Sequence, residues 1–174
     1  KQQVKLKIEQ AVDRLGPISG IIHGAGNLAD KPLEKKLEAD YDLVFKTKVK
    51  GLKTLLDCTT LSQIRYVILF SSVSGFLGQM GQTDYSLANE ILNKFAHAMA
   101  QRCPDALIRS INWGPWDGGM VTPLLKRIYK QFDINVISIQ EGAKLFVEEL
   151  VADDNANNQV LICPEGLFQM DAKI

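Results

Sequence analysis

The chain has 174 residues, with 20 lysines and arginines balanced by 20 aspartates and glutamates, so its formal net charge is zero. Such a balance gives no basic surface for nucleic acid or an anionic membrane, and no apolar run is long enough to span a bilayer. An apolar content of 46% over this length is ordinary for one globular domain with a hydrophobic core.

The hydrophobic pattern alternates between helical and extended segments from the start of the chain. An amphipathic helix is predicted over residues 1–15, followed by a short apolar strand over 18–23 that leads into the turn Gly24-Ala25-Gly26. A long helix is predicted over 37–58, and the continuous apolar run over 66–71 is typical of a strand covered on both faces. The later elements are a glycine-rich loop over 74–82, helices over 83–102, 121–132 and 140–151, and strands over 106–112 and 159–163.

Strands that alternate with helices predict parallel pairing through right-handed crossovers. The expected fold class is α/β, a Rossmann-like, doubly wound parallel sheet in a single domain over residues 1–174. A dinucleotide-binding fold of this kind opens with a strand, a glycine-rich turn that holds the pyrophosphate, and a helix. This chain starts on a helix, and Gly24-Ala25-Gly26 has the wrong length, so we expect the N-terminal βαβ unit with the phosphate loop to lie upstream of Lys1. The strand over 18–23 would then be an exposed edge, which favours pairing with the missing part of the domain or with a second copy in a homodimer.

The cysteines and histidines give no sign of a disulfide framework or a metal site. Cys58, Cys103 and Cys163 are widely spaced and odd in number, which fits a reducing compartment such as the cytoplasm. Neither His23 nor His97 has a cysteine or histidine at metal-binding spacing. We therefore expect no bound metal.

Lys48 stands out within the predicted helix over 37–58. At about 3.6 residues per turn it falls in the middle of an apolar stripe, whereas the other lysines of this region fall on solvent-facing positions. A buried ammonium is costly unless it is paired or functional, so Lys48 is a candidate for chemistry; alternatively, its head group reaches solvent past its neighbours. The stripe consists of Leu37, Tyr41, Val44, Gly51, Leu52 and Leu55, and the solvent-facing lysines are Lys35, Lys36, Lys46, Lys50 and Lys53.

Tyr85 and Asn89 form a second polar feature. They lie four residues apart near the start of the predicted helix over 83–102, so they share its otherwise apolar inward face. Tyr85 could be a core aromatic with a satisfied hydroxyl, and Asn89 a local cap. In a functional interpretation, the asparagine carries a water relay or fixes a lysine.

Ser72 follows the apolar run directly, at the carboxyl edge where ligands bind to open α/β sheets. Serines are common in such turns, and Ser71 and Ser74 are rival candidates. A ketone that receives a hydride needs a proton donor and a group that polarises its oxygen. Tyr85 could donate that proton, with its usual pKa of about 10 lowered by the Lys48 ammonium, while Ser72 holds the substrate carbonyl.

The same residues carry a resemblance to the ketoreductase domains of modular polyketide synthases, in the short-chain dehydrogenase/reductase superfamily. Tyr85-Ser-Leu-Ala-Asn89 is similar to their Y-x-x-x-N stretch, and Lys48-Val-Lys-Gly51 to their K-V-x-G segment. Most short-chain dehydrogenases place the lysine four residues after the tyrosine, whereas these ketoreductases take it from the preceding helix, as this chain does. The stretches GIIHGAG and INWGPWDGGMVTP extend the resemblance over about residues 18–163. INWGPWDGGMVTP, together with HGAGNLADK, looks most similar to the synthases of polyunsaturated fatty acids and to related iterative polyketide or glycolipid synthases.

The resemblance implies NADPH-dependent reduction of a 3-oxoacyl thioester held by an acyl carrier protein, inside a synthase whose other domains are further partners. It implies proton donation by Tyr85 and substrate binding by Ser72. It also implies that Lys48 contacts the nicotinamide ribose and tunes Tyr85, and that Asn89 supports the proton relay. The other residues that it places against the cofactor are Ala25, Gly26, Pro115 and Trp116.

Further matches concern stereochemistry and substrate entry. Leu28-Ala29-Asp30 resembles the L-D-D motif of ketoreductases that form the D-hydroxy product, with alanine in place of the first aspartate and Asp30 as the last. Leu77 stands where the opposite class has a tryptophan, which favours a D-3-hydroxyacyl product, although Asp30 could also be a surface turn residue. Met120 would border the substrate entrance, and residues 121–133 would form a substrate lid.

Two other interpretations stay open. The chain could be an inactive scaffold half that cannot bind cofactor without the missing N-terminal segment. Alternatively, Ser72 or Ser74 could serve a serine hydrolase, although no G-x-S-x-G elbow surrounds them. For that chemistry, His97 lies on the solvent side of its helix, and His23 is expected to be a packed residue at a strand end.

Overall fold

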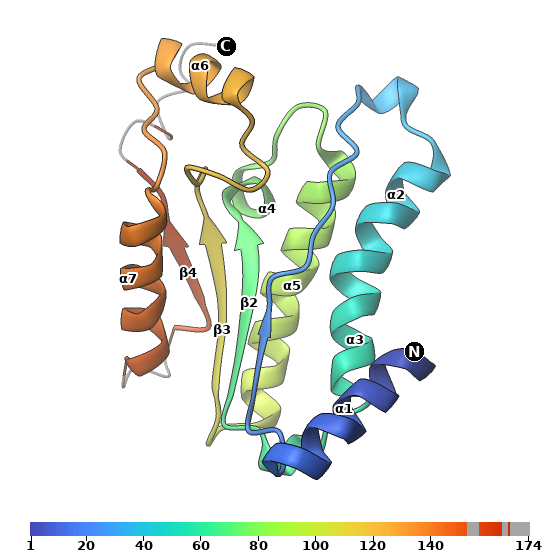
Figure 1. The fold of residues 1–174 in the computed structure, drawn as a ribbon. Helices are drawn as coiled ribbons and strands as arrows, with labels where there is room; N and C mark the ends of the chain where they lie inside the picture. The colour runs from blue at the N-terminus through green and yellow to red at the C-terminus, as the bar shows by residue number, and fades with distance from the viewer. Residues whose placement is uncertain (153–156, 165–166, 168–174) are drawn as a thin grey trace.

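The computed structural model describes residues 1–152, 157–164 and 167. Among these residues, four parallel strands form one sheet in the order β1-β2-β3-β4 (Figure 1). The predicted α/β class is therefore confirmed, and β1 lies at one edge of the sheet. The strands are β1 (Gly20–His23), β2 (Tyr66–Ser72), β3 (Leu107–Trp113) and β4 (Gln159–Ile162).

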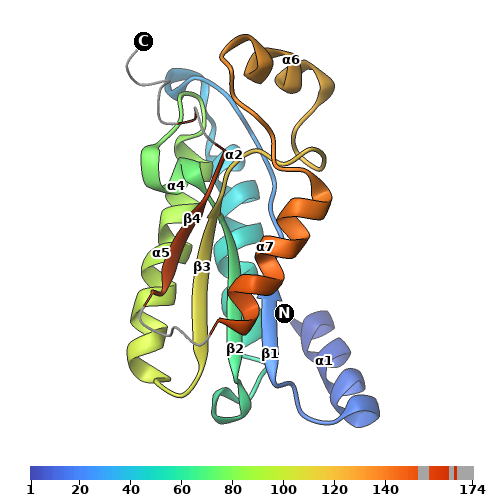
Figure 2. The same cartoon turned by 90° about the vertical axis from the view of Figure 1, so that its left-hand side faces the viewer.

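Helices cover both faces of the sheet. Helix α5, with α2 and α3 beside it, lies against one face, and α7 lies against the other (Figures 1 and 2). Helix α6 lies beyond the carboxyl ends of the strands, and α1 lies near their amino ends. In the part of the chain that the structure describes, no helix combines the length and apolar character needed to cross a membrane. The helices are α1 (Gln2–Leu15), η1 (Leu33–Lys35), α2 (Glu38–Phe45), η2 (Lys46–Lys50), α3 (Gly51–Leu56), η3 (Leu61–Gln63), α4 (Val73–Leu77), α5 (Thr83–Arg102), α6 (Pro123–Gln131) and α7 (Ile139–Val151).

The last connection between strands differs from the first two. All three connections step in the same direction along the sheet, but α2, α3 and α5 pass over one face and α7 passes over the other (Figure 2). The first two are right-handed and the connection β3–α7–β4 is left-handed, whereas the sequence pattern predicted right-handed crossovers throughout. On its own face of the sheet, α7 covers the buried side chains Ile68, Ile111 and Trp113, which would otherwise be exposed.

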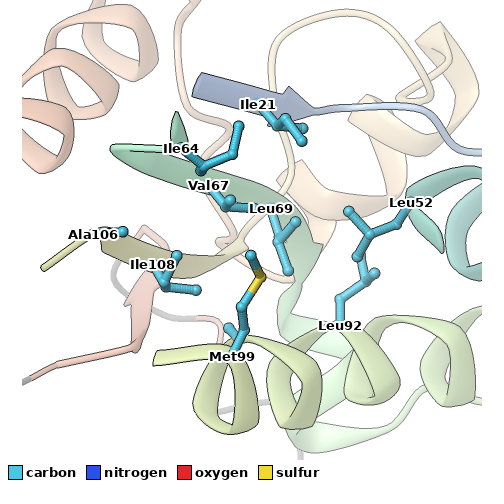
Figure 3. Close-up of a cluster of buried hydrophobic side chains, with 10 residues drawn as sticks. Ile21, Leu52, Ile64, Val67, Leu69, Leu92, Met99, Ala106 and Ile108 are labelled. Carbon is cyan, nitrogen blue, oxygen red and sulfur yellow. The ribbon is translucent and has the colours of Figure 1, made fainter. Parts of the chain in front are cut away.

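The core forms two layers, because successive side chains of a strand point to opposite faces of the sheet. Val67 and Leu69 of β2 point toward α5, where they pack with Leu92 and Met99 (Figure 3). Ile68, between them in sequence, belongs to the cluster beneath α7. The central strand β2 is thus buried on both faces, as its continuous apolar sequence predicted.

The helix predicted over 37–58 is not continuous. Helices α2 and α3 are joined by the π-helical turn η2, and Lys48 lies within that turn. A π turn contains an extra residue, so the side chains before and after it do not follow one helical wheel. Leu37, predicted to belong to the apolar stripe, precedes α2 and is 63% exposed.

The loop predicted over 74–82 begins with a short helix, α4. The Ser72 hydroxyl caps this helix by accepting a hydrogen bond of 3.2 Å from the Ser74 N–H. Gly78 ends it with a φ of 76°, a left-handed conformation that favours glycine. The cap places Ser72 and Ser74 at the carboxyl end of β2 in a defined geometry rather than in a flexible loop.

Gly142 allows α7 to lie directly against the indole of Trp116. A Cβ at this position would lie 2.4 Å from the Trp116 ring. Glycine-to-alanine changes in a helix usually stabilise by up to about 1 kcal/mol. For Gly142→Ala we expect instead a loss of about 1–3 kcal/mol in the free energy of unfolding, because the ring must move.

The matched control is Gly51→Ala in α3. Its Cβ would make an ordinary contact, 3.5 Å from Cε1 of His23, so this variant should be slightly more stable than the parent. Denaturant unfolding of both variants measures the difference. A stabilising effect of Gly142→Ala would contradict the packing described for α7.

Candidate active site

A cavity of about 730 Å³ lies at the carboxyl ends of β2 and β3, with Leu125 and Tyr129 of α6 on one side. Open parallel sheets bind ligands at this edge. Side chains from the turn η2, the β2–α4 junction, the start of α5 and the β3–α6 connection meet here. The predicted site residues that line the cavity are Lys48, Ser72, Leu77, Tyr85, Pro115, Trp116 and Met120, and those outside its lining are Ala25, Gly26, Asp30 and Asn89.

Lys48 is buried, with 3% of the residue exposed, so its head group does not reach solvent past its neighbours. The ammonium donates a hydrogen bond of 2.9 Å to the Phe70 carbonyl and lies 5.3 Å from the centre of the Tyr85 ring. Burial lowers the pKa of Lys48 from 10.5 to about 8. Among the described residues no carboxylate lies within ion-pair distance of it, so much of its donor capacity is available to a ligand.

Tyr85 projects from the first turn of α5 into the cavity. Burial is the main cause that raises the pKa of its phenol, and the negative charge of Asp30 adds to the effect. Interactions with the side chains of Asn89 and Ser72 act in the opposite direction. The expected lowering of this pKa by Lys48 is therefore wrong in this structure, because burial is the largest cause of the shift and the charge of Lys48 is not among its causes.

The three candidate serines have different hydrogen-bond partners. Ser71 is buried and donates to the Asn89 carbonyl at 3.2 Å and to Asn112 Oδ1 at 3.3 Å. Ser74 is also buried, and its hydroxyl donates to Ser72 Oγ at 3.1 Å. Ser72 accepts from both the N–H and the hydroxyl of Ser74, so its own O–H can donate toward the Tyr85 phenol or toward a ligand in the cavity.

Asn89 is fully buried behind Tyr85 rather than in the cavity lining. Its Nδ2 donates to the Tyr85 carbonyl at 2.8 Å, which ties the side chain to the first turn of α5. Its Oδ1 has no hydrogen-bond partner among the described residues. The structure therefore shows a direct link from Asn89 to the Tyr85 backbone and none to Lys48.

The predicted cofactor residues fall into two groups. Pro115 and Trp116 line the cavity, and Trp116 meets Trp113 edge-on, with ring centres 4.8 Å apart. Gly26 lies behind Lys48, where a Cβ would come within 3.2 Å of Lys48 Cε and 3.0 Å of the Met120 methyl carbon. Ala25 is exposed. Glycine at position 26 thus permits the close approach of the segment after β1 to the Lys48 ammonium.

The residues predicted to control stereochemistry lie at the rim of the site. Asp30 is exposed and accepts a hydrogen bond of 2.8 Å from Gln82, just before α5. Leu77 lines the cavity from the end of α4. The sulfur of Met120 lies 3.8 Å from the Tyr85 hydroxyl, which places this side chain beside the phenol.

Neither histidine is placed for hydrolase chemistry. His23 is buried and its Nε2 donates to the Lys48 carbonyl at 2.8 Å, while burial lowers its pKa. His97 is exposed on α5. His23 is therefore a packed strand-end residue, as predicted, and it holds the backbone of the π turn. Within the described ranges, no cluster of three or more His, Cys, Asp or Glu side chains could hold a metal ion.

A buried ion pair next to Tyr85 was not predicted from the sequence. Lys36, predicted to face solvent, has a side chain that is 1% exposed and pairs with Asp84 at 2.5 Å. The prediction failed because Lys36 lies between η1 and α2, so the helical wheel does not apply to it. The only sign in the sequence that Asp84 could belong to the site was its position directly before Tyr85.

The parallel sheet, with helices on both faces and a cavity at the carboxyl ends of its strands, defines a Rossmann-like protein. The sequence model of the KR domain matches residues 1–118. The chain belongs to the KR domain family.

Two relatives show where such chains occur. Over 128 residues, 74% of this chain, it is 43% identical to one subunit of the polyunsaturated fatty acid synthase of Thraustochytrium sp.. Over 164 residues, 87% of this chain, it is 33% identical to the polyketide synthase PksN of Bacillus subtilis. The matched regions are 4% and 3% of those two proteins, so the chain spans a small part of each.

Solved structures agree with this assignment. A ketoreductase domain from the bacillaene assembly line superposes with a TM-score of 0.84 at 31% identity, over 99% of this chain and 42% of that one. An N-terminal ketoreductase from the macrolactin assembly line gives a TM-score of 0.82 at 23% identity, over 99% of this chain and 33% of that one. The second likeness concerns the fold alone.

Proposed function

We propose that this chain carries the catalytic residues of a ketoreductase that reduces a 3-oxoacyl thioester on an acyl carrier protein to the 3-hydroxyacyl thioester, with NADPH as reductant. The observation that carries the proposal is the meeting of Lys48, Ser72 and Tyr85 around one cavity. They come from the turn η2, the end of β2 and the start of α5. The relatives, which are polyketide and polyunsaturated fatty acid synthases, support the substrate class and the presence of further domains as partners.

In this mechanism Tyr85 donates the proton to the substrate oxygen as the carbonyl carbon accepts the hydride. NADPH, when bound, supplies that hydride. The raised pKa keeps the phenol of Tyr85 protonated until the oxygen becomes basic. The O–H of Ser72 donates to the same oxygen, and the Lys48 ammonium beside the ring stabilises the phenolate that forms.

The residues around Lys48 fit a nicotinamide ribose. The Lys48 ammonium donates one hydrogen bond to the Phe70 carbonyl. Its other N–H groups remain as donors for ribose hydroxyls on the side of Gly26. Gly26 lets the segment after β1 pack against Lys48, and Pro115 and Trp116 offer an apolar wall for the ring. Ala25 is assigned to the outer part of the same cofactor site, and Asn89 to support of the proton relay through the Tyr85 backbone.

Substrate orientation is assigned to the rim of the cavity. Leu77 and Met120 line the cavity, and Asp30 is hydrogen-bonded to Gln82 of its lining; we assign these three residues to formation of the D-3-hydroxyacyl product. Residues 121–133, which include α6, are assigned as the substrate lid because Leu125 and Tyr129 of this segment line the cavity. The edge strand β1 is open to pairing with further strands, from the same domain or from a second copy.

Fluorescence titration with NADPH, followed by turnover of a 3-oxoacyl thioester of N-acetylcysteamine, tests the function. The protein that contains this chain should bind NADPH and release the 3-hydroxyacyl thioester, which chiral chromatography should identify as the D isomer. A protein that binds no NADPH and reduces no thioester would favour the inactive scaffold instead. The L isomer would overturn only the stereochemical assignment.

Ser72→Ala gives a second test within the same assay. We expect kcat to fall about 100-fold, because one donor to the reacting oxygen is removed. Ser62→Ala is the matched control, since Ser62 is exposed in η3 and outside the cavity lining. Equal kcat values for the two variants would argue against a role of Ser72 in substrate binding.

A further inference from the structure

The buried ion pair between Lys36 and Asp84 links two segments that carry the proposed site. Lys36 also donates to the Ala29 carbonyl at 2.8 Å, in the segment between β1 and η1 that contains Asp30. Asp84 lies in the first turn of α5, directly before Tyr85. One ammonium thus connects the rim of the cavity to the helix that bears the phenol.

Asp84 acts on Tyr85 through the backbone as well. The oxygen that receives the Lys36 ammonium, Oδ1, also accepts a hydrogen bond of 2.9 Å from the Tyr85 N–H. Asp84 Oδ2 is buried without a hydrogen-bond partner among the described residues, so the carboxylate is held from one side only. The position of the Tyr85 backbone is therefore coupled to the position of Lys36.

Two further hydrogen bonds join the same two segments. The N–H of Lys31 donates to the Gly81 carbonyl at 3.0 Å, and Gln82 donates to Asp30 at 2.8 Å. The Gln82–Asp30 contact is exposed, whereas the Lys36–Asp84 pair is withdrawn from water, with both side chains 1% exposed. The buried pair is the part of this junction that solvent does not screen.

Stability alone is a poor explanation for such a pair. The free-energy cost of removing two charges from water offsets most of their attraction, and an apolar pair of similar volume is often at least as stabilising. A buried ion pair therefore contributes little net stability, but it constrains geometry strongly. A second pair, Arg109 with Glu149, joins β3 to α7, with the Glu149 side chain 25% exposed. Neither residue lines the cavity, which makes that pair a control for disruption of an ion pair away from the site.

We propose that Lys36 and Asp84 are positioning residues for the reaction. Together they fix the position of Tyr85, next to Lys48, relative to the segment that contains Asp30. The proposal rests on the proposed function of Tyr85 as proton donor. Neither residue contacts the cavity, so both act through the backbone of Tyr85 and of Ala29. Their loss should affect the chemical step rather than the binding of cofactor.

The test compares Asp84→Asn and Lys36→Met with the double variant Lys36→Met/Asp84→Leu, in the protein that contains this chain. Asparagine keeps an acceptor for the Tyr85 N–H but loses the charge. The double variant leaves no unpaired buried charge, so it should fold even where a single variant does not. We expect kcat to fall at least tenfold in all three, with the Kd for NADPH within twofold of the parent.

Two controls separate positioning from stability. Lys36→Arg keeps the charge and should restore most of kcat. Glu149→Gln weakens the partly buried Arg109–Glu149 pair and should lower the melting temperature with kcat unchanged at a temperature well below it. Parent-like kcat in the double variant would overturn the proposal. A parent protein that reduces no 3-oxoacyl thioester would instead overturn the proposed function.

Discussion

Tyr85→Phe is expected to lower kcat for reduction of a 3-oxoacyl thioester by a factor of about 100 to 10,000, because the reaction loses its general acid. The cavity keeps its shape, since only the hydroxyl is removed. That hydroxyl contacts Met120 Sδ at 3.8 Å, a weak interaction, so the free energy of unfolding should change little. Single-turnover absorbance of NADPH at saturating thioester isolates the chemical step from product release.

Tyr66→Phe is the matched control for this variant. Tyr66 begins β2, at the end of the strand opposite the cavity, and does not line it. Its kcat should equal that of the parent. Reduction by Tyr85→Phe at more than half of the parent rate would show that another group donates the proton and would remove the main support for the proposed mechanism.

Lys48→Met is expected to have two opposite effects: loss of reduction and a gain in stability. Burial lowers the pKa of Lys48 from 10.5 to about 8, so the folded protein holds this proton less tightly than the unfolded chain does. Below pH 8 both states are protonated and the full penalty applies, which amounts to about 3 kcal/mol at most. The lost hydrogen bond to Phe70 offsets part of the gain.

The pH dependence of stability gives the sign of this effect. Between pH 8 and 10.5 the unfolded chain binds more protons at Lys48 than the folded protein does, so the free energy of unfolding of the parent should rise with pH. Lys48→Met should lack this rise. Urea unfolding at pH 7, 8.5 and 10 measures it, with Lys50→Met as control because Lys50 is exposed in the same turn.

Catalysis and cofactor binding complete the test of Lys48. The variant should reduce the 3-oxoacyl thioester at least 100-fold more slowly and bind NADPH more weakly, since both a ribose contact and the cation beside Tyr85 are lost. A variant that is less stable than the parent at pH 7 would contradict the buried, unpaired state of this ammonium. Unchanged turnover would contradict its role in the reaction.

Much of the architecture could be predicted from the order of apolar segments. The continuous run that forms β2 is buried on both faces, and the alternation of strands with helices led to the parallel sheet. The candidate site residues Lys48, Ser72 and Tyr85 could also be predicted from the sequence. A lysine in an apolar stripe and a tyrosine on an inward helical face conflict with a simple local pattern, whereas Ser72 was a candidate because it follows the carboxyl end of a strand.

Other features depended on packing between distant segments. The π turn that holds Lys48, the left-handed connection through α7 and the capped helix α4 change local geometry without a strong signal in hydrophobic periodicity. The raised pKa of Tyr85 also depends on packing between distant segments. Burial is the largest cause of this shift, and burial is a property of the assembled cavity.

The sequence by itself determined the α/β class, the layers of the core and the residue types at the site, because hydrophobic periodicity and motif spacing are local properties of the chain. Only the tertiary structure decided which of these residues meet. Lys36 lies 48 positions from Asp84 and was predicted to face solvent, yet the fold buries both beside Tyr85. Such a pair forms when two segments pack over a shared core. No pattern within either segment indicates that the two side chains will lie next to each other in space.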